Sequence, residues 1–145
     1  MTDISADGGD GVEWLGTRYR TALTTADSGG AICVVDSWSP AGSGPPRHVH
    51  DAEDETFVVL EGTLDLWIEG TTRRLGPGEA GFIPRGSEHT FRCVTDNRHL
   101  VILTPGGFEG FFTEMAAGQF RVPEDMARVT ESGARHNVRF TGPPL

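Results

Sequence analysis

The sequence has little that would attract a nucleic acid or a membrane. Its 145 residues carry 12 basic against 21 acidic side chains, for a formal net charge of −9 at pH 7. No run of basic residues offsets this charge locally, and a negative surface repels phosphates and anionic lipids. No stretch approaches the ~20 apolar residues that span a bilayer, and the acidic N-terminus lacks a signal-peptide pattern. We therefore expect a cytoplasmic protein that binds neither nucleic acid nor membrane.

Cysteine is also scarce. The two present, Cys33 and Cys93, lie in segments with the composition of strands. The cytosol keeps such thiols reduced, so we expect two small core residues and no disulfide.

Glycine and proline, in contrast, are plentiful. The 20 glycines and nine prolines interrupt short runs rich in Val, Ile, Leu and Phe. Breaks at intervals of about ten residues are typical of an all-β sandwich or barrel, and the length fits one domain. We expect a flexible acidic segment over residues 1–12 and a single domain over 13–145. The predicted strands are residues 16–25, 31–38, 55–60, 63–69, 71–75, 80–83, 90–95 and 99–103.

A two-residue turn is predicted at Glu61-Gly62, which would pair residues 55–60 with 63–69 as a hairpin. That register sets Glu55 opposite Ile68 and points its carboxylate into an apolar interior. On the outer face Trp67 lies among acidic neighbours, which fits either exposure to solvent or burial in a subunit contact; of the two we expect the contact, in a homodimer.

The hydrophobic period changes after Pro105. Residues 108–116 and 123–134 have helical patterns, and Pro123 fits the first turn of the second helix. We expect two short C-terminal helices that pack on the barrel or cap its mouth.

Three histidines and one glutamate are predicted to converge. His48 and His50 are two residues apart on a strand, so their rings share a face, and Glu55 returns to that face on the following strand. His89 follows the break at Pro84 and opens a strand that can approach from the opposite sheet. Three imidazoles and a carboxylate suit zinc, iron, nickel, manganese or cobalt, so we predict a metal site on His48, His50, Glu55 and His89.

These residues stand in two patterns that resemble the paired motifs of the cupin family. The first is G(X)5HXH(X)4E(X)6G, formed by Gly42, His48, His50, Glu55 and Gly62. The second is G(X)5PXG(X)2H, formed by Gly78, Pro84, Gly86 and His89. Cys93 departs from the family pattern, which has a non-ligating Asn there. The resemblance implies a cupin jelly-roll barrel, and the ends of the chain look like the small cupins related to quercetin dioxygenases and polyketide cyclases.

The resemblance implies one divalent ion per chain, with zinc expected for a cyclase and iron, nickel or manganese for an oxygenase. The leading hypothesis is an aromatic polyketide cyclase of antibiotic biosynthesis that closes rings of a poly-β-ketone by aldol-type chemistry. A quercetinase-like dioxygenase and a non-catalytic small-molecule-binding cupin are the alternatives. Glu55 and His50 are the candidate catalytic residues, and Glu55 serves either as a permanent ligand or as a general base.

The remaining predictions concern the pocket and two further histidines. A hairpin over residues 96–97 would place His99 about 16 Å along the ladder from His89, too far to share the ion. His136 follows the second helix and is interpreted as a surface residue; contact with metal or substrate is the alternative. An aromatic or polyketide substrate is expected in a pocket lined by Phe57, Leu66, Phe82 and Phe91.

Overall fold

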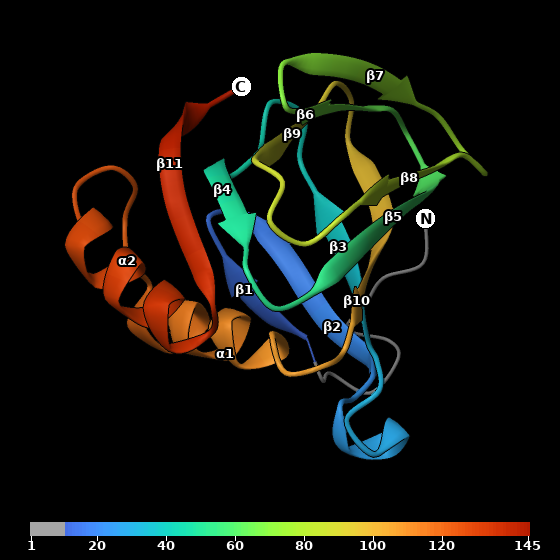
Figure 1. The fold of residues 1–145 in the computed structure, drawn as a ribbon. Helices are drawn as coiled ribbons and strands as arrows, with labels where there is room; N and C mark the ends of the chain where they lie inside the picture. The colour runs from blue at the N-terminus through green and yellow to red at the C-terminus, as the bar shows by residue number, and fades with distance from the viewer. Residues whose placement is uncertain (1–10) are drawn as a thin grey trace.

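Two antiparallel sheets face each other across the core, and two helices cover one end (Figure 1). The computed structural model describes residues 11–145, so residues 1–10 of the predicted flexible segment lie outside the described residues. Within that range the mostly-β architecture with two C-terminal helices confirms the predicted cupin jelly roll. Neither helix in the described range is long and apolar enough to cross a membrane.

Six strands form the first sheet in the order β1-β2-β3-β10-β5-β8. Their bounds are Val12–Trp14 (β1), Thr17–Leu23 (β2), Cys33–Ser39 (β3), Asn97–Thr104 (β10), Asp54–Glu61 (β5) and Ala80–Ile83 (β8). The second sheet has the order β11-β4-β9-β6-β7. Its strands are Val138–Pro144 (β11), Pro46–His50 (β4), His89–Cys93 (β9), Leu64–Ile68 (β6) and Thr71–Leu75 (β7).

Both predicted hairpins that follow the first cupin motif are wrong. β5 pairs with β10 and β8, whereas β6 pairs with β7 and β9. The turn at Glu61-Gly62 therefore carries the chain from one sheet to the other. Gly62 has a φ of +79°, and a Cβ there would lie 2.2 Å from the Asp96 carbonyl oxygen. Only glycine fits this corner without strain. The segments 90–95 and 99–103 likewise belong to opposite sheets.

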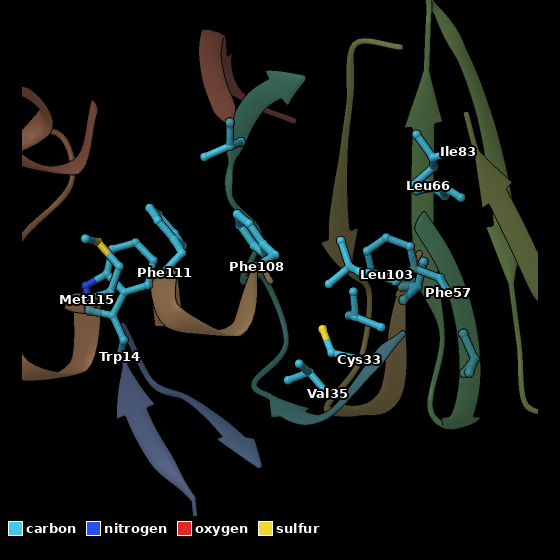
Figure 2. Packing of buried hydrophobic residues seen from close by; sticks show 14 of the residues in the cluster. Trp14, Cys33, Val35, Phe57, Leu66, Ile83, Leu103, Phe108, Phe111 and Met115 are labelled. Atoms are coloured by element: carbon cyan, nitrogen blue, oxygen red, sulfur yellow. The ribbon is translucent and has the colours of Figure 1, made fainter. Parts of the chain in front are cut away.

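Although the predicted hairpin is wrong, the side chains that it predicted to face the interior do face the interior. Phe57 and Val59 of β5 and Leu64 and Leu66 of β6 are all buried between the sheets, and so is Glu55. Alternation of side chains along a strand fixes which residues face inward, whichever strand lies alongside. Figure 2 shows part of this core, including Phe57, Leu66 and Leu103.

The helices follow β10. Helix α1 spans Glu109–Gly118 and α2 spans Met126–Arg135. The second helix thus begins at Met126, three residues after the predicted Pro123, which lies in the preceding turn. Phe111 and Met115 of α1 pack beside Trp14 of β1 (Figure 2). The Trp14 indole donates a hydrogen bond to the Phe120 carbonyl at 2.8 Å, which ties the helical layer to the barrel.

Two smaller features complete the fold. Cys33 and Cys93 are buried free thiols, as expected. On the outer face of β6 the Arg47 guanidinium lies 4.5 Å from the centre of the Trp67 ring. The predicted homodimer contact at Trp67 stays a prediction.

Candidate metal centre

His48, His50, Glu55 and His89 converge inside the barrel. One ligand atom from each lies within 4.8 Å of the ligand atoms of the other three, and all four residues are buried. The predicted set is therefore assembled, but from different directions than expected. β4 and β9 are neighbours with His48 directly opposite His89, so the three imidazoles share the five-stranded sheet. Glu55 reaches them from the opposite sheet.

A single carboxylate oxygen is the focus of this cluster. Glu55 Oε2 lies 2.9 Å from His50 Nε2 and 3.2 Å from His89 Nε2. Local backbone contacts hold the two histidine strands together: the Gly86 amide donates to the His50 carbonyl at 2.8 Å, which fixes the loop that leads into His89. Gly86 has a φ of +84°. The Pro-X-Gly turn of the second motif thus positions His89.

Two backbone carbonyls fix the tautomers of the His48 and His89 rings. His48 Nδ1 lies 2.8 Å from the Pro46 carbonyl oxygen, and His89 Nδ1 lies 3.0 Å from that of Ser87. A carbonyl oxygen only accepts, so each Nδ1 carries the proton and each neutral ring turns its Nε2 lone pair into the site. Where such a nitrogen lone pair faces a carboxylate oxygen, the two atoms repel each other unless a cation or a proton lies between them. The donor set therefore fits a divalent metal ion.

The charges of the cluster agree with this reasoning. Burial raises the pKa of Glu55, but the adjacent His50 and His89 outweigh it and hold that pKa well below its usual range. Burial lowers the pKa of His89, but Glu55 outweighs it and raises that pKa above its ordinary value. Burial beside His89 and His50 lowers the pKa of His48 to about 3. The carboxylate thus favours a positive charge at the position that a metal ion would take.

Glu53 is a further residue of this centre that the sequence analysis did not single out. It is buried, and its Oε2 lies 3.8 Å from His50 Nδ1. Neither atom has a hydrogen-bond partner within residues 11–145. Burial raises the pKa of Glu53. A carboxylate behind a ligating imidazole orients the ring, and the two-residue spacing from Glu55 was the signal that could have revealed it.

The cluster opens into a cavity of about 300 Å³. Phe57 and Phe91 line it as predicted. Leu66 and Phe82 do not, because Leu66 is buried against Gly81 and Phe82 is 57% exposed. Four further aromatic side chains, from the helical end and from β11, also line it: Phe108, Phe111, Phe112 and Phe140. The sequence analysis missed them because the loop, helix and C-terminal strand that carry them could not be placed over the barrel.

The two remaining histidines lie in different surroundings. His99 is fully buried and lines the same cavity, which the false hairpin over residues 96–97 had obscured. His136 is partly buried, with Nδ1 donating to the Ser132 carbonyl at 2.9 Å and its ring beside Phe111. Neither residue belongs to the four-residue cluster.

Comparisons with known proteins agree with the fold. The family model described as a cupin domain matches residues 37–105. Quercetin 2,3-dioxygenase from Bacillus subtilis is 33% identical over 95 residues, which cover 65% of this chain and 28% of that protein. The structure of the polyketide cyclase RemF from Streptomyces resistomycificus has 27% identity and a TM-score of 0.57, covering 72% of this chain and 79% of that one. The structure of KdgF from Halomonas sp. aligns with a TM-score of 0.65 and 22% identity, over 72% of this chain and 94% of the KdgF chain. At this identity the likeness shows the fold alone.

The jelly roll carries a three-histidine, one-glutamate cluster on two spaced motifs, which together form a candidate metal centre. The match to the cupin domain, the curated relatives and the RemF structure support membership of the cupin superfamily. It spans under a third of the length of the curated quercetin dioxygenases that it matches, 28% and 29%.

Proposed function

We propose that this protein is a metal-dependent cyclase that closes rings in an aromatic poly-β-ketone. One observation carries the proposal: an ionised, buried carboxylate, Glu55, lies beside three imidazoles in an aromatic-lined cavity. Support also comes from RemF, a polyketide cyclase that aligns over 79% of its length. A divalent ion, zinc in this proposal, would supply positive charge that stabilises an enolate oxygen.

The low pKa of Glu55 limits the chemistry that this residue can perform. A carboxylate whose pKa is held well below its usual range is a weak base. It can accept only a proton that is already acidic, such as that of a methylene between two carbonyls or of an enol. Poly-β-ketones offer such protons at every second carbon. The electrostatics of Glu55 therefore support a substrate with such acidic protons.

The cavity wall supplies the rest of the catalysis. Phe57, Phe91 and Phe108 offer flat apolar surfaces that exclude water and limit how a flexible chain can fold. Orientation of reacting carbons can lower a barrier by up to ~7–11 kcal/mol in well-aligned cases. Deprotonation by Glu55 would give an enolate whose carbon attacks a second ketone, forming the new C–C bond and an alkoxide. Return of the proton from Glu55 to that alkoxide would complete the aldol ring and regenerate the carboxylate.

A quercetinase-like dioxygenase is the second candidate, favoured by the 33% identity to the Bacillus protein. In that reading Glu55 takes the hydroxyl proton of a flavonol-like hydroxy-ketone, and a redox-active ion replaces zinc. A non-catalytic small-molecule-binding cupin is a weaker candidate, because it gives no role to the four converging donors.

The test combines metal analysis with two activity assays. Protein purified without added metal is analysed for bound elements and added to a reconstituted aromatic minimal polyketide synthase, alongside Glu55→Gln and chelated wild type. A shift from a spontaneous mixture to one cyclised product, lost in both controls, supports the cyclase. Oxygen uptake on a flavonol without any change in the polyketide products would replace the cyclase by the dioxygenase.

A further inference from the structure

Three polar side chains form a row on the inner face of the six-stranded sheet. Tyr19 of β2 and His99 of β10 are each paired in register with Ser37 of β3, one on either side. Side chains of directly opposite residues point to the same face, and all three line the cavity. Tyr19, Ser37 and His99 are called the polar row below.

The polar row lies at a distance from the metal ligands. Glu55 is paired with Leu103 of β10, and His99 precedes Leu103 by four positions on that strand, about 13 Å at ~3.3 Å per residue. Between the two positions the rings of Phe57 and Phe91 lie 5.5 and 5.2 Å from the His99 ring, centre to centre. The cavity therefore has a polar group at each end and aromatic walls between them.

The hydrogen-bonding capacity of the row is only partly used. His99 Nδ1 lies 2.8 Å from Asn97 Oδ1, an oxygen that only accepts, so the proton is on Nδ1 and Nε2 carries a lone pair. Within residues 11–145 no group is hydrogen bonded to His99 Nε2. Ser37 Oγ is fully buried and likewise has no partner there. A buried hydroxyl without a hydrogen-bond partner destabilises the folded protein. Ser37 Oγ and His99 Nε2 are therefore suited to bind a polar group of a ligand.

We propose that the polar row binds a neutral hydroxyl group at the end of a flat substrate remote from the metal centre. The hydroxyl donates to His99 Nε2 and accepts a hydrogen bond from Ser37 Oγ. Burial keeps His99 neutral by lowering its pKa to about 4, so a carboxylate would face a lone pair and is rejected. Tyr19 forms the β2 end of the polar row, and its ring stacks on that of Phe112 with 4.3 Å between the ring centres.

The inference rests on the proposed function in one respect, namely that the metal end holds a ketone or enol oxygen of the same molecule. The substrate is then an elongated polyphenol or partly cyclised polyketide with a phenolic or enolic hydroxyl at its far end. Among substrates that bind the metal equally well, the polar row would favour those that carry this hydroxyl.

Binding of two flavonols to the zinc-loaded protein tests this subsite. Quercetin and 3-hydroxyflavone share the chelating hydroxy-ketone, but only quercetin carries further ring hydroxyls. Dissociation constants are measured anaerobically by fluorescence quenching for wild type, Ser37→Ala, His99→Phe and His99→Gln. Ser39→Ala is the matched control, because Ser39 faces the same way on β3 but its hydroxyl is already paired with Thr17 at 3.1 Å.

We expect wild type to prefer quercetin, and Ser37→Ala and His99→Phe each to reduce the preference by roughly 3- to 10-fold, the effect of one lost hydrogen bond. Binding of 3-hydroxyflavone and the preference of Ser39→Ala should be unchanged. If His99→Phe does not fold, Ser37→Ala and His99→Gln carry the test. Equal losses for both ligands, or an unaltered preference, would overturn the subsite, while chelator-sensitive binding of 3-hydroxyflavone would show that the metal centre itself is intact. Failure of wild type to bind either flavonol would also overturn the subsite, and the proposed function would then be judged separately by the polyketide product assay.

Discussion

Acid should destabilise this protein partly through His99. The pKa of His99 is lowered by burial from 6.5 to about 4. Between these values the unfolded chain binds a proton that the folded chain does not, so stability falls as the pH falls from 6.5 towards 4. The linkage relation gives a loss of about 1.4 kcal/mol at about pH 5.5 and roughly 2–3 kcal/mol at about pH 4.5.

The measurement compares wild type with His99→Gln, which has no proton to gain. Free energies of unfolding are obtained from urea denaturation at several pH values between about 4.5 and 7.5, with chelator present so that metal loss contributes equally. The difference in the free energy of unfolding, wild type minus variant, should decrease as the pH is lowered, by the losses given above for each pH. Parallel pH profiles would refute the reasoning, because they would mean that His99 is not desolvated as the structure shows.

Further expectations concern the metal centre. His48→Ala, His50→Ala and His89→Ala should each abolish stoichiometric binding of a divalent ion in elemental analysis, because each removes one donor; full occupancy in two of the three would contradict the site. Glu55→Gln should weaken the ion less than any histidine change yet suppress turnover, and an unaffected rate would remove Glu55 from the mechanism. Glu53→Leu should raise the metal Kd at least about tenfold in a competition titration if the carboxylate orients His50, and an equal Kd would exclude that role. Because the pKa of His89 is raised above its ordinary 6.5, protons already compete with the ion for this ring above pH 6.5, so metal affinity should rise with pH and fall as the pH is lowered through that range. Calorimetry in two buffers of different ionisation enthalpy would reveal the displaced proton, and identical heats in both would exclude it.

The composition of the site could be predicted because it is encoded locally. The spacing of His48 and His50 puts both rings on one face of any strand, and the inward direction of Glu55 follows from alternation with Phe57 and Val59. None of this depends on which strands are neighbours. The cupin motifs added His89, whose position depends on contacts between distant segments.

Strand neighbours could not be predicted, because register is decided by long-range packing. Glu61-Gly62 has the composition of a hairpin turn, yet here it is a corner between the sheets, and the close approach of Asp96 to Gly62 that enforces the corner is invisible in the sequence. The second false hairpin, over residues 96–97, is the error that hid the place of His99 in the cavity. The cavity mouth was missed for a similar reason, because Phe140 lies on β11, which the sequence analysis did not recognise as a strand.

Strand β11 has a consequence for the order of synthesis. It pairs with β4, with Val138 opposite His50 and Phe140 opposite His48. A ribosome therefore makes both cupin motifs well before it makes the strand that completes the sheet around two of the ligands. Contacts this distant in sequence form slowly. We expect the nascent chain to hold its ion weakly until residues 138–144 have left the exit tunnel, so the metal supply at that late moment decides which ion the protein acquires.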